Sequence, residues 1–312
     1  MKAVSNHLAT VSGPVLVTGA TGLVGHALVC RLLEDGYVVH ALIRNPLKAK
    51  FPATDHLRIF LGDITNPDEV VRAMEGCACV FHTAAMTKPW TKDRAQMYKV
   101  NLGGTRHVLD AALKLNIKRV VFTSSCAVAG PSFNAPLTEE DPRMAPYLHD
   151  YEISKKLAED LVTVYRQKGL DVVIVSPAKV FGEGIPSHSI SLNSIITGFL
   201  KRKFIVLPRP GNYLVSVIYL KDVVQGHVLA MWQSPPNEKY FLSGHWLPQS
   251  EIFSKVAQMA GVAARVIIVP KWLARAISYS MFIRSLFTPD DSFNPHSVKA
   301  LFHHYAYSSE KA

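Results

Sequence analysis

Short apolar runs alternate with segments of helical spacing through the first half of the chain. The apolar runs cover residues 15–18, 37–43, 57–61, 79–82, 119–123 and 171–175, and the helical segments cover 23–33, 66–74, 100–115 and 151–167. Unbroken apolar runs are typical of strands that are buried on both faces of a sheet. Strands that alternate with helices pair in parallel through right-handed crossovers. The pattern therefore predicts an α/β fold built on a doubly wound parallel sheet.

Beyond Pro177 the alternation becomes looser. Helical spacing returns at 191–201, 220–232 and 249–260, and shorter apolar runs occupy 215–219 and 240–242. We expect a first domain over residues 1–180, to which 212–245 return, and a smaller lobe that covers most of 181–312. Such a lobe would lie over the carboxyl edge of the sheet, where ligands of these sheets bind.

The stretch 272–287 combines apolar residues with the cations Lys271, Arg275 and Arg284. A basic apolar helix can lie on a membrane surface, and the same spacing suits a helix that packs its apolar stripe against a protein core. We favour the packed helix, because such stripes more often face a core. No run approaches the ~18 consecutive apolar residues that a membrane span needs.

Composition and charge narrow the class of protein. The chain has 312 residues, 48% of them hydrophobic, and Lys plus Arg exceed Asp plus Glu by ten. We interpret this excess as spread along the chain, and no nucleic-acid motif accompanies it, so we expect no nucleic-acid partner. The four cysteines lack metal-ligand spacing, which predicts reduced thiols and no metal site. The first dozen residues lack the apolar run of a signal peptide, and we expect a cytoplasmic protein.

Glycines stand at positions 19, 22 and 25, between the first predicted strand and the first predicted helix. Glycine there lets the chain turn sharply, lets a phosphate approach the backbone, and lets the helix pack closely on the strand. The free N–H groups at the helix start attract an anion. Because the loop has both neighbours that a dinucleotide site requires, we expect a Rossmann domain, with an ordinary tight turn as the alternative.

Arg44 stands at the end of the second predicted strand, where an acidic residue would select NAD and a cation would accept the 2′-phosphate of NADP. The strand ends Leu-Ile-Arg-Asn without a carboxylate, so we expect NADP(H) rather than NAD(H). A solvated arginine is the alternative. Asp63 follows the third predicted strand and could accept a hydrogen bond from adenine, although a helix N-cap is a close rival.

Tyr151 and Lys155 lie four residues apart and therefore on one face of a predicted helix. A phenol has an ordinary pKa of about 10, and a nearby cation such as Lys155 favours the phenolate and lowers that value. Tyr151 could then exchange a proton with a carbonyl or alcohol oxygen. Two serines, 124 and 125, end the fifth predicted strand and could donate to that oxygen.

Several motifs together resemble the extended short-chain dehydrogenase/reductases of the NAD(P)-dependent epimerase/dehydratase superfamily. They are the loop at 18–25, Gly-Asp-Ile at 62–64, the segment 80–85, Asn-Leu-Gly-Gly-Thr at 101–105, Thr-Ser-Ser at 123–125, and Ser-Pro-Ala-Lys-Val-Phe-Gly at 176–182. The resemblance implies that Ser125, which precedes Gly130 by five residues, is the catalytic serine beside Tyr151 and Lys155. It also implies a set of cofactor contacts: Gly19, Thr21, Gly22, Leu23, Val24, Arg44, Asp63, Ile64, Thr83, Ala84, Ala85, Tyr151, Lys155, Pro177 and Val180.

Within that superfamily, segments 41–46 and 128–131 are similar to dihydroflavonol-reductase-like and 3β-hydroxysteroid-dehydrogenase-like members. The resemblance implies reduction of a carbonyl, or oxidation of a secondary alcohol, on a small-molecule substrate. Two alternatives remain: a nucleotide-sugar epimerase or dehydratase, and a dinucleotide-binding redox sensor without catalysis. Ala129 replaces the tyrosine that sugar epimerases commonly have, and an intact Tyr/Lys pair speaks against the sensor. The sequence leaves open whether the protein is a monomer or a homodimer.

Overall fold

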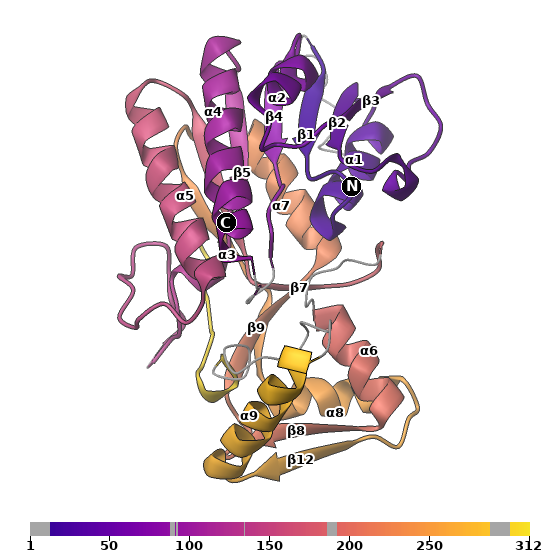
Figure 1. Ribbon diagram of the computed structural model, residues 1–312, viewed down its shortest axis with the longest axis vertical. Coiled ribbons are helices and arrows are strands. Elements are labelled where there is room, and N and C mark those ends of the chain that lie inside the picture. Colours follow the sequence, from indigo (N-terminus) through magenta and orange to yellow (C-terminus); the bar gives the residue numbers. More distant parts are fainter. Residues whose placement is uncertain (1–12, 88–90, 92, 134, 186–191, 288–299) are drawn as a thin grey trace.

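The computed structural model describes residues 13–87, 91, 93–133, 135–185, 192–287 and 300–312. Residues 1–12, for which we expect no signal peptide, lie outside this part. A seven-stranded sheet in the order β10-β6-β5-β4-β1-β2-β3 forms the upper half of Figure 1, and all its neighbours pair in parallel. Its strands are β1 (Val15–Thr18), β2 (Val39–Ile43), β3 (Leu57–Leu61), β4 (Cys79–His82), β5 (Arg119–Thr123), β6 (Val172–Pro177) and β10 (Lys239–Leu242). The doubly wound parallel sheet that the sequence predicts is confirmed.

Helices cover both faces of the sheet, and each face has its own core. Helices α1 (Leu23–Glu34) and α7 (Leu220–Trp232) cover one face, while α2 (Pro67–Met74), α4 (Thr105–Lys114) and α5 (Asp150–Gln167) cover the other. Strand β1 shows the division, because Val15 and Val17 pack toward α1 and α7 whereas Leu16 packs toward the opposite helices. This burial on both faces explains why the strands are unbroken apolar runs.

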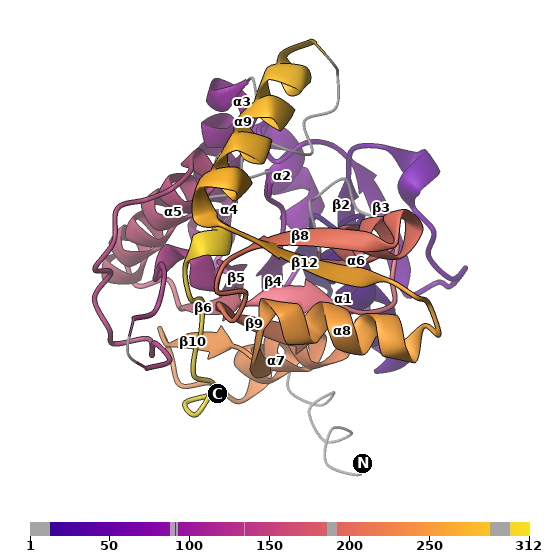
Figure 2. The same cartoon turned by 90° about the horizontal axis from the view of Figure 1, so that it is seen from below.

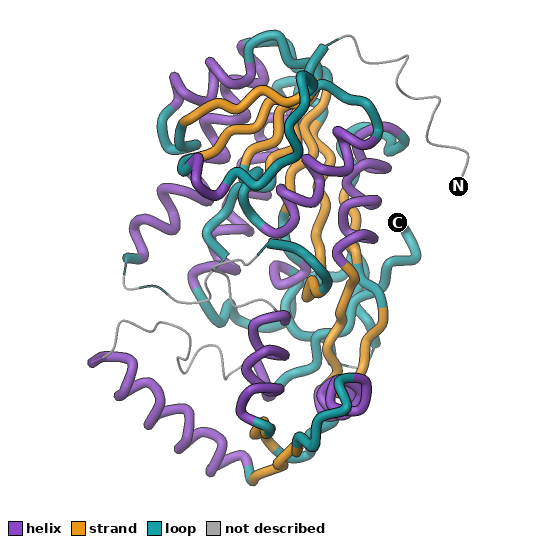
Figure 3. Tube along the Cα trace, turned by 90° about the vertical axis from the view of Figure 1, so that its right-hand side faces the viewer, coloured by secondary structure: helices purple, strands orange, loops and turns teal. Residues whose placement is uncertain are grey.

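The smaller lobe lies at the carboxyl end of the sheet, below it in Figures 1 and 3. The connection is direct, because β6 ends at Pro177 and β7 begins at Lys179. In the described part of the lobe, a three-stranded sheet consists of β7 (Lys179–Phe181), β9 (Leu214–Tyr219) and β11 (His245–Pro248). A two-stranded sheet consists of β8 (Phe204–Pro208) and β12 (Arg265–Val269). The helices of the lobe are α6 (Leu192–Arg202), α8 (Gln249–Met259) and α9 (Lys271–Phe287). Of the segment 212–245, α7 and β10 join the large sheet while β9 lies in the lobe. Because β6 of the large sheet and β7 of the lobe meet at Ala178, we propose a domain boundary near residue 180.

The helix predicted over 100–115 is continuous but not uniform. A short α3 (Arg94–Tyr98) leads into a π-helical turn at Lys99–Gly104, which then passes into α4. Gly104 is pressed against Ile64, since a Cβ on Gly104 would lie 2.5 Å from the Ile64 Cδ1 atom. The wider turn buries the side chain of Asn101 beneath the segment that follows β4.

Helix α9 exists where the sequence predicts it, and it has one packed and one exposed apolar face. It packs on the lobe through small side chains, since Ala274 and Ser278 are buried. Leu273 and Ile277 on the same side are half-buried, whereas three other large apolar side chains point to solvent: Trp272 is 69%, Tyr279 61% and Ile283 58% exposed. The helix therefore packs one face on the lobe, as we favoured, and leaves a second apolar face exposed. Among the described residues, no helix is long and apolar enough to cross a membrane.

Candidate active site

The glycine loop between β1 and α1 is tightly folded. Gly19 has a φ angle of +70°, and a Cβ atom there would lie 2.6 Å from the backbone nitrogen of Ala84. A Cβ on Gly25 would lie 2.3 Å from the carbonyl oxygen of Gly19. Helix α1 follows Gly22 and has neither a side-chain cap nor an acidic residue in its first turn. Its first amide groups are therefore open to an anion such as a pyrophosphate.

Two cavities meet at this loop and share Gly19, Gly22, Thr83 and Ala85. The larger has a volume of about 710 Å³ and lies at the ends of β2 and β3, and the smaller has about 280 Å³ and reaches α5 and the lobe. The larger is also lined by Thr21, Arg44, Asp63, Ile64 and Ala84. The smaller is also lined by Leu23, Val24, Ser125, Tyr151, Lys155, Pro177 and Val180. Every residue assigned from the sequence thus lines one of two joined cavities, an arrangement that fits a two-part dinucleotide.

The larger cavity has an excess of cations among its described lining residues. The Nη1 atom of Arg44 lies 3.6 Å from Oδ2 of Asp63. The Arg44 side chain is 71% exposed, so the pair contributes little to stability and leaves the guanidinium accessible to a ligand. Lys48 and Lys50 line the same cavity. Three cations beside one carboxylate suit this end of the site to a negatively charged group.

Asp63 is not the helix cap that we considered as its rival role. The cap of α2 is Asn66, whose Oδ1 accepts a hydrogen bond from the Asp68 amide. Asp63 instead accepts a hydrogen bond from the Thr65 amide through Oδ1, at 2.9 Å, and faces Arg44 through Oδ2. It lines the cavity, so an adenine contact remains our proposal.

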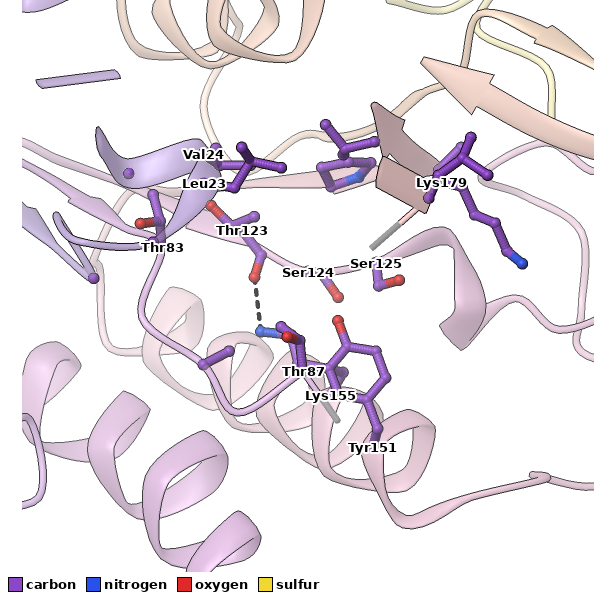
Figure 4. A pocket seen from close by; sticks show the side chains of 18 of the residues that line it. Leu23, Val24, Thr83, Thr87, Thr123, Ser124, Ser125, Tyr151, Lys155 and Lys179 are labelled. Carbon is purple, nitrogen blue, oxygen red and sulfur yellow. Dashed lines mark hydrogen bonds between the residues drawn. The ribbon is translucent and has the colours of Figure 1, made fainter. Parts of the chain in front are cut away.

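The two serines that follow β5 have different surroundings. The Ser124 hydroxyl donates to Oε1 of Glu159 at 2.5 Å and is buried. Figure 4 shows both serines near the phenol of Tyr151 in the smaller cavity, and the hydrogen bond to the phenol comes from Ser125. Because Glu159 holds Ser124, Ser125 is the hydroxyl available to a substrate oxygen.

Lys155 lies one turn after Tyr151 on α5, and its side chain is buried. Its Nζ donates to the carbonyl oxygen of Thr123 at 2.7 Å and lies 4.2 Å from the centre of the Phe122 ring. Desolvation lowers the pKa of Lys155 to about 7, although the negative charge of Glu159 acts in the opposite direction. A proton on this amine can therefore exchange near neutral pH.

The pKa of Tyr151 differs from the expectation that Lys155 lowers it. Burial raises the pKa of the phenol to about 12, and the hydrogen bond with Ser125 only partly opposes this effect. The charge of Glu152 adds to the increase. In this structure Tyr151 is therefore a protonated phenol at neutral pH, which suits it to donate a proton when a carbonyl is reduced.

The sequence did not predict the role of two residues that support the site, Asn101 and Glu159. Asn101 donates through Nδ2 to the Ser154 hydroxyl and to the carbonyl of Met86, which joins α5 to the segment after β4. Glu159 binds Ser124 and also pairs with Lys239 at 2.8 Å. The spacing of four residues from Tyr151 through Lys155 to Glu159 could have revealed this third polar position on the same helix face.

The lobe closes the smaller cavity with few side chains. Lys179, Leu192 and Ile195 line it from β7 and α6, together with the expected Val180. Next to Val180, the ring of Phe181 packs 5.7 Å from that of Tyr219. The residues from 186 to 191, which include His188, lie outside the described part.

A doubly wound sheet with joined cavities at its glycine loop defines a dinucleotide-binding domain. The family model described as "NAD dependent epimerase/dehydratase family" matches residues 15–242. The chain belongs to this family.

Named relatives carry both reductase and epimerase activities. The chain is 32% identical over 275 residues to a putative dihydroflavonol 4-reductase of Synechocystis, a match that covers 86% of this chain and 78% of the relative. It is 30% identical over 252 residues to a 3β-hydroxysteroid dehydrogenase/Δ5→4-isomerase of Mycobacterium tuberculosis, covering 76% and 66%. Among solved structures, the UDP-glucose 4-epimerase of Thermus thermophilus in complex with NAD has a TM-score of 0.70 and 26% identity, covering 82% and 86%. These matches confirm the expected superfamily and the expected similarity to its dihydroflavonol-reductase-like and 3β-hydroxysteroid-dehydrogenase-like members.

Proposed function

We propose that the protein is an NADP(H)-dependent oxidoreductase that reduces a carbonyl, or oxidises a secondary alcohol, with Ser125, Tyr151 and Lys155 as its catalytic residues. One observation carries the proposal. The side chains of Ser125 and Tyr151 line the smaller cavity and interact through a hydrogen bond, whereas the competing Ser124 hydroxyl is held by Glu159.

The chain's own residues would act on the substrate oxygen. Ser125 and Tyr151 would both donate hydrogen bonds to a carbonyl oxygen placed between them. A bound nicotinamide dinucleotide would supply or accept the hydride. As negative charge develops on the substrate oxygen, Tyr151 would give it the phenol proton, which the raised pKa keeps in place at neutral pH. Lys155, with a pKa near 7, would then supply the proton that restores the Tyr151 phenol.

The preference for NADP(H) is supported by the cations at the larger cavity. Arg44, Lys48 and Lys50 line it, and the end of β2 offers no carboxylate to a ribose hydroxyl. An arginine fork is well suited to a phosphate group. The Thermus thermophilus epimerase is in complex with NAD, and our proposal of NADP(H) rests only on the residues at the end of β2 in this chain.

The test is net consumption of reduced cofactor. The protein is incubated with NADPH and one candidate substrate at a time: a ketone, an aldehyde or a nucleotide sugar. Both the nicotinamide absorbance and the organic product are followed. We expect NADPH to be oxidised in equal amount to the alcohol formed. Conversion of a nucleotide sugar without a net change in absorbance would contradict the proposal and favour an epimerase, and cofactor binding without any conversion would favour a sensor.

A further inference from the structure

Helix α9 presents an apolar stripe to solvent. Trp272, Ala276, Tyr279 and Ile283 are spaced by four, three and four residues, which places them on one side of a helix. All four are exposed, whereas Ala274 and Ser278 attach the helix to the lobe. Leu273 and Ile277 flank the packed face and are half-buried, so the exposed stripe is a second apolar face of the same helix.

The neighbouring strands add to this apolar surface. Strands β8 and β12 lie beside α9 at the end of the lobe farthest from the large sheet, and Figure 2 looks onto this end. The register of β8 with β12 places Phe204 and Ile267 on the same face, and these side chains are 47% and 43% exposed. The opposite face, which includes Leu207, packs against α6 and α8. Aromatic and aliphatic side chains are therefore exposed on three adjacent elements.

Positive charge is concentrated in the same part of the lobe. Residues 192–213 and 245–283 contain eight Lys or Arg and a single acidic residue, Glu251, so they hold seven of the ten excess positive charges of the chain. The basic residues are Lys201, Arg202, Lys203, Arg209, Lys255, Arg265, Lys271 and Arg275, and all are exposed. From the sequence we expected the excess charge to be spread along the chain. Most of it lies in these two segments of the lobe instead.

We propose that this end of the lobe, formed by α9, β8 and β12, binds the surface of an anionic phospholipid bilayer. Trp and Tyr favour the boundary between lipid headgroups and acyl chains, and a basic helix with an exposed apolar stripe lies in that boundary without crossing it. Anionic headgroups attract Lys and Arg that lie near the surface. Five of these cations lie in or next to α9, β8 and β12: Lys203, Arg209, Arg265, Lys271 and Arg275. A second copy of the chain is disfavoured as the occupant, because two such ends would bring ten like-charged side chains together.

The test measures sedimentation of the full-length protein with vesicles. Phosphatidylcholine vesicles that contain phosphatidylserine are compared with pure phosphatidylcholine vesicles, at low and high salt. We expect binding to the anionic vesicles only, and weaker binding at high salt because the attraction is screened. Replacing Trp272, Tyr279 and Ile283 together by serine should weaken binding by at least about tenfold, because their apolar area no longer enters the interface.

A matched variant replaces two exposed apolar residues outside the lobe, Phe133 and Met144, by serine. It should bind vesicles like the wild type. Dinucleotide affinity should be unchanged in both variants and shows that each is folded; if the triple variant fails to fold, K271E/R275E replaces it and should also lose binding. Equal binding by wild type and triple variant, no binding to anionic vesicles, or a dimer that the triple substitution dissociates would each overturn the proposal.

Discussion

Replacing Gly19 by alanine tests the close contact on which the glycine loop depends. The new carbon would lie 2.6 Å from the nitrogen and 2.7 Å from the Cα of Ala84, and neither backbone atom can rotate away. The φ angle of +70° adds strain of about 1–2 kcal/mol for a residue with a side chain. Forcing a carbon into packed backbone costs about 1–3 kcal/mol more. We expect Gly19→Ala to lower the free energy of unfolding by about 2–5 kcal/mol.

Gly76→Ala is the matched control, because Gly76 has nearly the same φ angle, +74°, and nothing within 4 Å of an added Cβ. This variant should lose only the strain of about 1–2 kcal/mol and should keep its dinucleotide affinity. Urea unfolding of both variants and the wild type measures the difference, provided that all three share one m value. Equal losses of stability in the two variants would refute the close approach of Gly19 to Ala84.

Three further predictions concern single side chains. Arg44→Asp should reverse the cofactor preference, measured as the ratio of NADP to NAD affinities; equal affinities in the wild type would remove its basis. Burial lowers the pKa of Lys155 from 10.5 to about 7, so between these pH values the unfolded chain holds more protons than the folded chain. The free energy of unfolding of the wild type should therefore rise relative to that of Lys155→Met between pH 7 and 9. Urea titrations measure this difference. An unchanged difference would contradict the buried amine. Ser125→Ala should lower turnover by about 100-fold or more, as loss of an oxyanion donor does, whereas Ser124→Ala should chiefly lower stability, because it removes a partner of the buried Glu159. The reverse pattern in steady-state kinetics would exchange the two serines.

Most of the large sheet could be predicted from the sequence because its strands are buried on both faces. Such strands are unbroken apolar runs, and the glycines that follow β1 mark the turn. Strands β7, β8, β11 and β12 were not predicted. Three-residue β7 gives too short a signal, and β8 and β12 are partly exposed and pair across more than fifty residues. Their pairing is tertiary, so local patterns do not reveal it.

The candidate site shows the same division between local and tertiary information. The spacing from Tyr151 to Lys155 places them on one helix face whatever surrounds them. The pKa of Tyr151, however, depends on burial, which the sequence does not state. Likewise the spacing of Trp272, Tyr279 and Ile283 identifies a helix face, but only the packing of Ala274 and Ser278 shows that this face points outward.

The measurement that tests the central proposal most directly is turnover of Tyr151→Phe, on a substrate identified by NADPH consumption. The variant lacks only the phenol oxygen, so the proton donor is lost while the cavity keeps its shape. We predict a fall in turnover of at least about 100-fold, with dinucleotide affinity and unfolding midpoint close to the wild type. Turnover at the wild-type rate would show that Tyr151 gives no proton to the substrate and would contradict the proposed chemistry.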